Sequence, residues 1–181
     1  MEQLLHYIWR HRLYAQVPLF TTNDQLVEVI DPGLPNRNAG PDFFNAKLKI
    51  DGVLWVGNVE IHTHASDWYV HGHQTNPLYH NVILHVVEEA DAEVRRADGE
   101  PVPQLVLHCP EAIAQRYEVA LLLTRKMTYL GIAKATGAST ATISRVNRSL
   151  TYGEDGYELV FGRLAEQGIE QKPAENADPK E

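Results

Sequence analysis

The chain has 181 residues, of which 44% are hydrophobic and 22% are charged, and its formal net charge is −8. These values are ordinary for a globular protein, and they exclude a fully disordered or fibrous chain. Its single cysteine, Cys109, excludes an internal disulfide framework and a cysteine-based zinc finger. No apolar run approaches the ~20 residues that cross a bilayer, and the N-terminus has no secretory pattern. We therefore expect a cytoplasmic protein without a membrane partner.

The first part of the chain predicts one short helix followed by strands. Apolar residues at helical spacing predict an amphipathic helix over 2–13. Asp51-Gly52 is typical of a hairpin turn, and the Gly-, Pro- and Asn-rich segment 31–42 predicts an ordered loop. Alternation or apolar runs predict strands at 26–30, 44–50, 53–61, 81–87 and 103–109.

The composition changes to helix formers after Pro110. The sequence predicts a helix at 111–126, two helices on either side of Gly137, and a further helical segment at 157–164. The expected fold class is α+β. We expect an α+β domain at 1–110, an all-α helix-turn-helix region at 111–166 and a disordered tail at 167–181.

The negative net charge hides a basic segment. Residues 111–150 hold six Lys or Arg and only two Asp or Glu, whereas residues 1–110 hold seven against fourteen. A basic segment of this kind is typical of a surface that contacts nucleic acid.

This basic segment contains the pattern of a DNA-binding helix-turn-helix. Thr128 and Ser139 stand where N-caps are expected, and Gly137 stands where a helix ends in a left-handed residue. Hydroxyls at a helix N-terminus suit phosphates, and Arg and Asn suit base edges. A helical hairpin with a merely polar face is the alternative. The residues predicted to contact DNA are Thr128, Ser139, Thr140, Thr142, Ser144, Arg145, Asn147 and Arg148.

Residues 111–166, with MTYLGIAKATGASTATISRVNRSL at their centre, resemble the Trp-repressor-like regulators, especially their uncharacterised bacterial branch. The resemblance implies a first helix at 128–136, a recognition helix at 139–150 and a homodimer on duplex DNA. The Trp repressor holds tryptophan with two arginines. Arg145 matches one of them, but Gln115 stands at the other position, with Arg116 beside it. The effector is therefore not assigned, and no cofactor is expected for this function. The helices that build the family's intertwined dimer are replaced here by a β-rich region.

Histidines and carboxylates gather in the β-rich region. Six of the nine histidines fall between positions 62 and 85. Neutral imidazoles and carboxylates bind divalent metals, so Mg²⁺ or Zn²⁺ is a candidate cofactor. Separate structural histidines are the alternative. The candidate ligands are Asp42, Glu60, His62, His64, His71 and His73.

Asp42 and Glu60 also suggest a nuclease site. A Pro-Asp followed by Glu-x-Lys on a neighbouring strand is the metal-binding core of restriction-endonuclease-like nucleases. Here His62 stands in place of the lysine, and Lys47 or Lys49 is the substitute that could reach in from the paired strand. The alternative is that Asp42 caps a turn and Glu60 is a solvated strand residue.

Residues 1–110 as a whole are similar to the start of a bacterial family of unknown function. LLHYIWRHRLY, VEVIDPGLPNRNAGPDFFNAKLKIDGVLWVGNVEIH and DWYVHGHQTNPLYHNVILHVV carry this resemblance. Because the two resemblances meet near Pro110, a natural fusion, a gene-prediction artefact and an artificial chimera remain open.

Three functions follow from these patterns. The first is a DNA-binding transcriptional regulator, which is not an enzyme. The second is a metal-dependent phosphodiesterase or nuclease that uses Asp42, Glu60 and His62. The third is a hybrid without function.

Overall fold

The computed structural model describes residues 2–14, 18–109 and 111–152. The chain forms two compact units, the N-terminal unit (Met1–Ala114) and the C-terminal unit (Gln115–Glu181). Within the described ranges, none of the helices has the length and apolar character needed to cross a membrane. The predicted helical segment at 157–164 and the predicted tail at 167–181 lie outside the described residues.

The order of elements in the sequence agrees closely with the expected one. The five strand predictions and the four helix predictions of the described ranges are confirmed to within a few residues. The segment between 65 and 80, for which no element was expected, forms three short helical turns. The elements are α1 (Glu2–Arg10), β1 (Leu19–Phe20), β2 (Leu26–Asp31), β3 (Leu34–Pro35), β4 (Phe43–Ile50), β5 (Val53–His64), α2 (Asp67–Val70), η1 (His73–Thr75), η2 (Pro77–Tyr79), β6 (Val82–Glu89), β7 (Gln104–Val106), α3 (Glu111–Thr124), α4 (Tyr129–Thr136) and α5 (Thr140–Tyr152).

β4 and β5 form an antiparallel hairpin whose turn is Asp51-Gly52. Both turn residues have positive φ angles, 50° and 79°. This conformation matches the twist of the two strands, and glycine adopts it without strain. The predicted hairpin turn is confirmed. It fixes a register in which Phe43 lies opposite Val59, and this register later decides which side chains meet.

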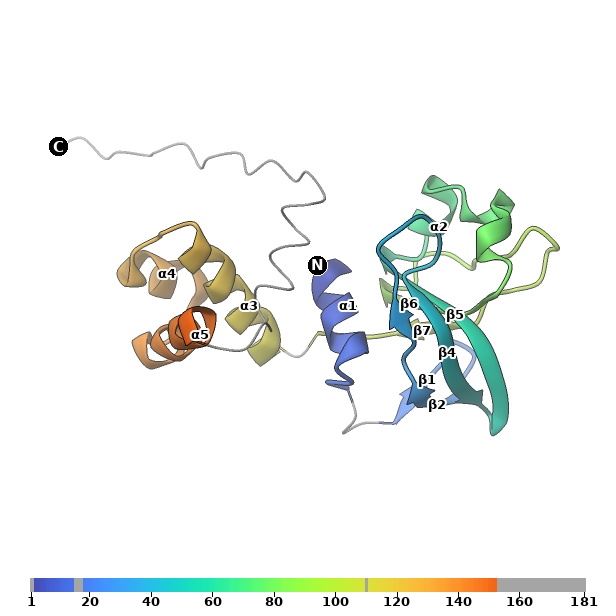
Figure 1. Cartoon of the computed structure of the whole chain (residues 1–181), viewed down its shortest axis with the longest axis horizontal. Coiled ribbons are helices and arrows are strands. Elements are labelled where there is room, and N and C mark those ends of the chain that lie inside the picture. Colours follow the sequence, from blue (N-terminus) through green and yellow to red (C-terminus); the bar gives the residue numbers. More distant parts are fainter. Residues whose placement is uncertain (1, 15–17, 110, 153–181) are drawn as a thin grey trace. The chain divides into compact units, whose positions relative to one another are not determined.

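The described strands form one mixed sheet with the order β1-β2-β4-β5-β6-β7, and β3 pairs with β4. β5, β6 and β7 are parallel. A parallel pair needs a crossover, and α2, η1 and η2 lie on the crossover from β5 to β6. The two outer strands come together where the Thr22 N–H donates to the Gln104 carbonyl at 2.8 Å and Thr21 pairs with Leu105. The sheet is therefore nearly closed and barrel-like (Figure 1).

The helix α1 packs against β5 and completes the core of the N-terminal unit. Its buried face consists of Leu4, Leu5, Ile8 and Trp9. The Trp9 indole N–H donates to the Pro32 carbonyl at 3.0 Å, which satisfies the polar atom of a fully buried ring. The helix that the sequence predicts at this position is thus held in place by its apolar face and by one hydrogen bond.

The C-terminal unit has three described helices around a small apolar cluster. α4 ends at Gly137, which is left-handed with φ of 68° as predicted. Burial of one face of each helix, rather than helix propensity alone, stabilises so small a unit. The buried residues are Val119, Ala120, Ile132, Ala138, Ile143 and Val146.

The fold class expected from the sequence, α+β with an all-α Trp-repressor-like region, is wrong. The chain instead forms a β-rich region with a nearly closed, barrel-like sheet, followed by a few helices. Alternation identifies strands but carries no information about closure, because closure depends on pairs far apart in the chain, such as Thr21 and Leu105. Capping residues likewise determine where helices begin and end, but they do not determine how the helices pack into a particular fold.

Candidate functional site

The register of β4 and β5 brings two carboxylates together. Asp42 directly precedes β4, and Phe43 pairs with Val59, so Asp42 lies beside Glu60. The Asp42 backbone N–H donates to Glu60 Oε2 at 3.0 Å, and the Ile61 backbone N–H donates to Asp42 Oδ2 at 2.9 Å. The two carboxylates are thus held by reciprocal bonds to each other's strand. In each carboxylate, the second oxygen takes no part in these two hydrogen bonds.

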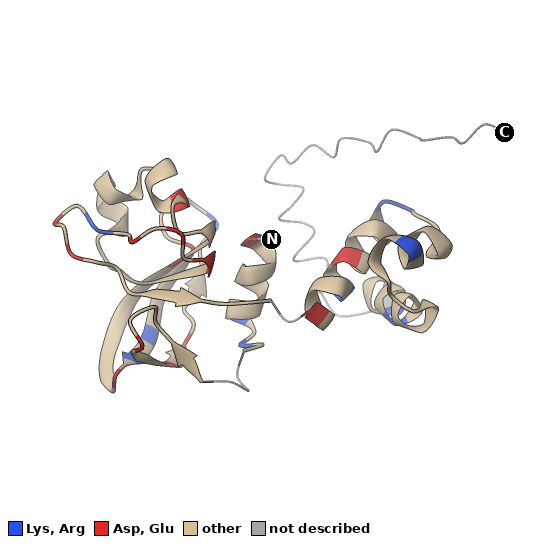
Figure 2. Ribbon diagram, turned by 180° about the vertical axis from the view of Figure 1, so that it is seen from behind, with Lys and Arg blue, Asp and Glu red and all other residues tan. Residues whose placement is uncertain are grey.

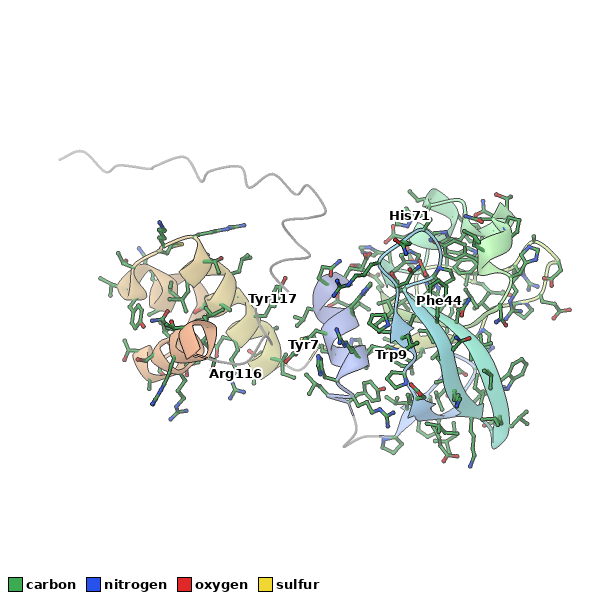
Figure 3. The ribbon with its side chains drawn as sticks, in the orientation of Figure 1. Tyr7, Trp9, Phe44, His71, Arg116 and Tyr117 are labelled. Atoms are coloured by element: carbon green, nitrogen blue, oxygen red, sulfur yellow. The ribbon has the colours of Figure 1, made fainter. Side chains whose placement is uncertain are left out.

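Two histidines contact the remaining oxygen of Glu60, and a third histidine contacts one of these two. His62 comes from β5, and His71 and His73 come from the crossover after α2. The distance from Glu60 Oε1 is 3.4 Å to His62 Nε2 and 3.2 Å to His73 Nε2. His71 Nδ1 lies 3.1 Å from His62 Nε2. In Figure 3, His71 is labelled close to the end of the sheet in the N-terminal unit.

His85 of β6 extends this group into the core. It lies opposite Glu60 in the parallel pairing of β5 and β6, and its Nε2 is 2.8 Å from His62 Nδ1. It is fully buried, with 0% of its surface exposed. We call Asp42, Glu60, His62, His71, His73 and His85 the histidine–carboxylate cluster.

Burial favours uncharged side chains in the histidine–carboxylate cluster. Loss of water lowers the pKa of His62 to about 4 and the pKa of His73 to about 4, and neighbouring imidazoles act in the same direction. Burial, with His62 and His73 nearby, holds the pKa of His85 well below its ordinary value. Burial and the charge of Asp42 raise the pKa of Glu60. Neutral imidazole is the form that binds metal ions.

The cluster is buried on one side and reaches water on the other. Glu60, His62 and His73 are 4%, 2% and 7% exposed. His71 is exposed, and one quarter of the Asp42 side chain is exposed. A small solute can therefore approach the cluster from the side of His71 and Asp42.

Two residues that the sequence linked to this site lie elsewhere. His64 is exposed and faces Asp67 and Glu89, at 3.8 Å and 3.7 Å. Lys47 pairs with Val56, four residues from Glu60, which is about 13 Å along the strand. The structure therefore brings five of the six candidate metal ligands together, without the lysine that a nuclease core requires.

Sequence reasoning missed three contributors. His85 interrupts an otherwise apolar strand, and this polar residue in NVILHVV was the available signal. His6 of α1 lies 3.4 Å from Asp42 Oδ2. The Tyr79 ring stacks on the His73 ring with 3.7 Å between centroids. The contact of His6 with Asp42 joins distant segments, and the stacking of Tyr79 on His73 depends on the fold of the two short turns between them, so no residue pattern predicts either contact.

In the C-terminal unit, the two predicted capping residues hold helix ends. Thr128 Oγ1 accepts from the Gly131 N–H at 3.2 Å, at the start of α4. Ser139 Oγ accepts from the Thr142 N–H at 3.1 Å, at the start of α5. Both oxygens accept backbone hydrogen bonds, so they position the helices.

The other predicted DNA-contacting residues lie on α5. Thr140, Ser144, Arg145 and Arg148 are exposed, and Thr142 and Asn147 are half-buried. Figure 2 shows basic residues on α4 and α5 and acidic residues on α3. The side of α5 that faces away from its buried residues is therefore polar and basic.

A cavity of about 250 Å³ also lies within the C-terminal unit. Its lining includes Arg116, Thr142 and Arg145. Gln115, which stands where the Trp repressor has an arginine, donates through its amide to the Thr136 carbonyl at 3.0 Å. Gln115 therefore helps to join α3 to α4.

Comparisons with known proteins match different shares of the chain. The family model "Protein of unknown function (DUF2851)" matches residues 2–137. The uncharacterized protein YerC of Bacillus subtilis (strain 168) is 52% identical over 60 residues, which are 33% of this chain and 58% of YerC. The solved structure of a TrpR-like protein from Eubacterium eligens is 64% identical, covers 30% of this chain and 57% of that one, and has a TM-score of 0.30.

This chain spans less than two thirds of YerC and of the Eubacterium eligens protein. The expected resemblance of residues 1–110 to a family of unknown function is confirmed, and the match continues beyond position 110. On the strength of a match to residues 2–137, the chain belongs to the family of proteins of unknown function DUF2851.

Proposed function

We propose that the C-terminal unit binds duplex DNA through the exposed side of α5. The observation that carries this proposal is the separation of faces on that helix. Ile143 and Val146 are buried, whereas Ser144, Arg145 and Arg148 are exposed. A helix anchored by one apolar face can present the other to the major groove, where Arg recognises guanine and Asn recognises adenine.

Electrostatics supports the same surface. The excess of basic residues between 111 and 150 provides the positive charge that releases counterions from a DNA backbone. The acidic residues of α3, Glu111 and Glu118, lie outside α4 and α5. Phosphates would meet the basic helices, and the strongly acidic N-terminal unit would be repelled from DNA.

The test is a salt titration of binding to random duplex DNA. Binding by the unmodified chain should weaken steeply as salt increases. On random duplex DNA, Arg148→Ala should weaken binding and reduce the salt slope by about 1 if Arg148 contacts a phosphate. If Arg148 reads a base, the loss of about 1–3 kcal/mol is expected on the preferred sequence. Arg148 is preferred over Arg145 because Arg145 also lines the cavity.

The matched control is Arg37→Ala, because Arg37 is exposed in the N-terminal unit and carries the same charge. This variant should bind DNA like the unmodified chain. Equal losses in both variants would mean that net charge, rather than α5, governs binding. Salt-independent binding would also refute the proposal.

A further inference from the structure

We infer that the N-terminal unit binds one zinc-class divalent cation through Glu60, His62, His71 and His73. This site is separate from the proposed DNA-binding surface and does not depend on it. The three histidines each offer a ring nitrogen, and these atoms all lie within 4.8 Å of one another. The side chains come from β5 and from the crossover between β5 and β6, so the fold positions them.

Three of the six distances between the four donor atoms match the edges of a tetrahedral site. A Zn–N bond of about 2.0–2.1 Å gives a tetrahedron whose edges are about 3.3–3.4 Å. Glu60 Oε1 is 3.4 Å from His62 Nε2 and 3.2 Å from His73 Nε2. His62 Nε2 and His71 Nδ1 are 3.1 Å apart. Each of these three separations suits two donors of one ion, and the nitrogens of the three histidines lie within 4.8 Å of one another.

A bound ion would replace the hydrogen bond between His71 Nδ1 and His62 Nε2, and the contact behind His62 would hold its ring in place. His62 Nδ1 lies 2.8 Å from His85 Nε2, and in the tautomer in which His62 Nδ1–H donates to His85, His62 Nε2 carries the lone pair that a metal ion would use. A second hydrogen-bonded residue behind a metal-binding histidine is the usual way of fixing its ring. His73 is 7% exposed, and neither of its ring nitrogens makes a hydrogen bond. A bound cation would give this buried imidazole, which lacks a hydrogen bond, a partner for its lone pair.

Charge favours a cation at the same place. Glu60 is buried and lies next to Asp42, and no Lys or Arg of the described residues forms an ion pair with either carboxylate. An ionised carboxylate is costly to bury without a compensating charge. A divalent cation would supply that charge, with Asp42 adding a second negative group close by.

The donor set selects the kind of metal. Imidazole suits Zn²⁺ and related transition metals, whereas Mg²⁺ prefers carboxylate, carbonyl and water oxygens. Three nitrogens and one oxygen therefore favour Zn²⁺ over Mg²⁺.

The experiment measures metal binding by the full chain, prepared without a histidine tag and treated with EDTA. Isothermal titration should give one Zn²⁺ per chain, and excess Mg²⁺ should not compete. Co²⁺ should produce the visible absorption bands of a tetrahedral site. His71→Ala should weaken Zn²⁺ binding by at least about tenfold, since loss of even an indirect partner typically costs 10–100-fold.

His80→Ala is the matched control, because His80 is exposed and lies outside the histidine–carboxylate cluster. It should retain the affinity of the unmodified chain. Unchanged Zn²⁺ affinity in His71→Ala, or equal losses in the two variants, would overturn the inference. Absence of tetrahedral Co²⁺ bands in the unmodified chain would overturn it without any variant. Effective competition by Mg²⁺ would also overturn it and would instead indicate a carboxylate site at Asp42 and Glu60.

Discussion

The two units place their chemically active side chains in opposite ways. The N-terminal unit buries them, with Glu60, His62 and His85 at most 4% exposed. The C-terminal unit exposes them on one helix, while its apolar residues face inward. A buried polar group needs partners from several elements, whereas an exposed helix face needs only its own periodicity. The comparison teaches that the surface can be predicted from local spacing and that the buried cluster requires the fold.

The largest expected effect tests whether the two units are energetically separate. Ile143→Ala removes a fully buried side chain from the small cluster of the C-terminal unit, so it should cost about 2–5 kcal/mol. All three tryptophans, Trp9, Trp55 and Trp68, lie in the N-terminal unit. The denaturation midpoint measured by helical circular dichroism should therefore fall. The midpoint measured by tryptophan fluorescence should stay unchanged.

Leu130→Ala is the control for this substitution, because Leu130 is 82% exposed and its loss removes little buried surface. A fluorescence midpoint that moves together with the circular dichroism midpoint in Ile143→Ala would show that the units unfold as one.

A smaller loss of stability is expected at Gly57 of the sheet, where β5 passes close to Asn81. A Cβ added at Gly57 would lie 2.4 Å from Ile83 Cγ2 and 2.7 Å from the Asn81 carbonyl oxygen. Gly57→Ala should therefore destabilise the N-terminal unit by about 1–3 kcal/mol through overpacking. Tryptophan fluorescence during urea denaturation measures this change.

Gly52→Ala separates crowding from backbone strain. Gly52 has φ of 79° and no atom within 4 Å of an added Cβ, so only its conformation opposes alanine. Its cost should be smaller than that of Gly57→Ala, about 1 kcal/mol. The reverse order would contradict the close approach at Gly57.

The smallest effect concerns the helix caps of the C-terminal unit. Thr128→Ala removes the oxygen that accepts from the Gly131 N–H, so it should cost about 1 kcal/mol. Thr140→Ala makes the same chemical change at an exposed position of α5, and it should be nearly neutral. Thermal unfolding followed by helical circular dichroism compares the two variants. Equal effects would show that the Thr128 cap contributes nothing beyond the loss of a threonine.

Much of the local structure followed from short sequence patterns. Asp51-Gly52 predicted its turn because only a few residue types tolerate two positive φ angles in succession. Thr128, Gly137 and Ser139 predicted helix ends because the unpaired N–H and carbonyl groups there need particular partners. In these cases the residues that determine the structure are neighbours in the chain.

The fold class and the composition of the buried cluster required the tertiary structure. Lys47 was a reasonable substitute for the missing lysine until the hairpin register placed it opposite Val56. His64 shares a strand with His62, yet the end of β5 leaves it exposed beside Glu89.

The sequence by itself determined the turn, the helix ends and the basic, polar face of α5, because these depend on spacing within one element. Only the tertiary structure decided that the sheet nearly closes, that His73 meets Glu60 and that His71 and His85 meet His62. Each of those contacts joins segments that approach one another only after strand register and crossover are fixed.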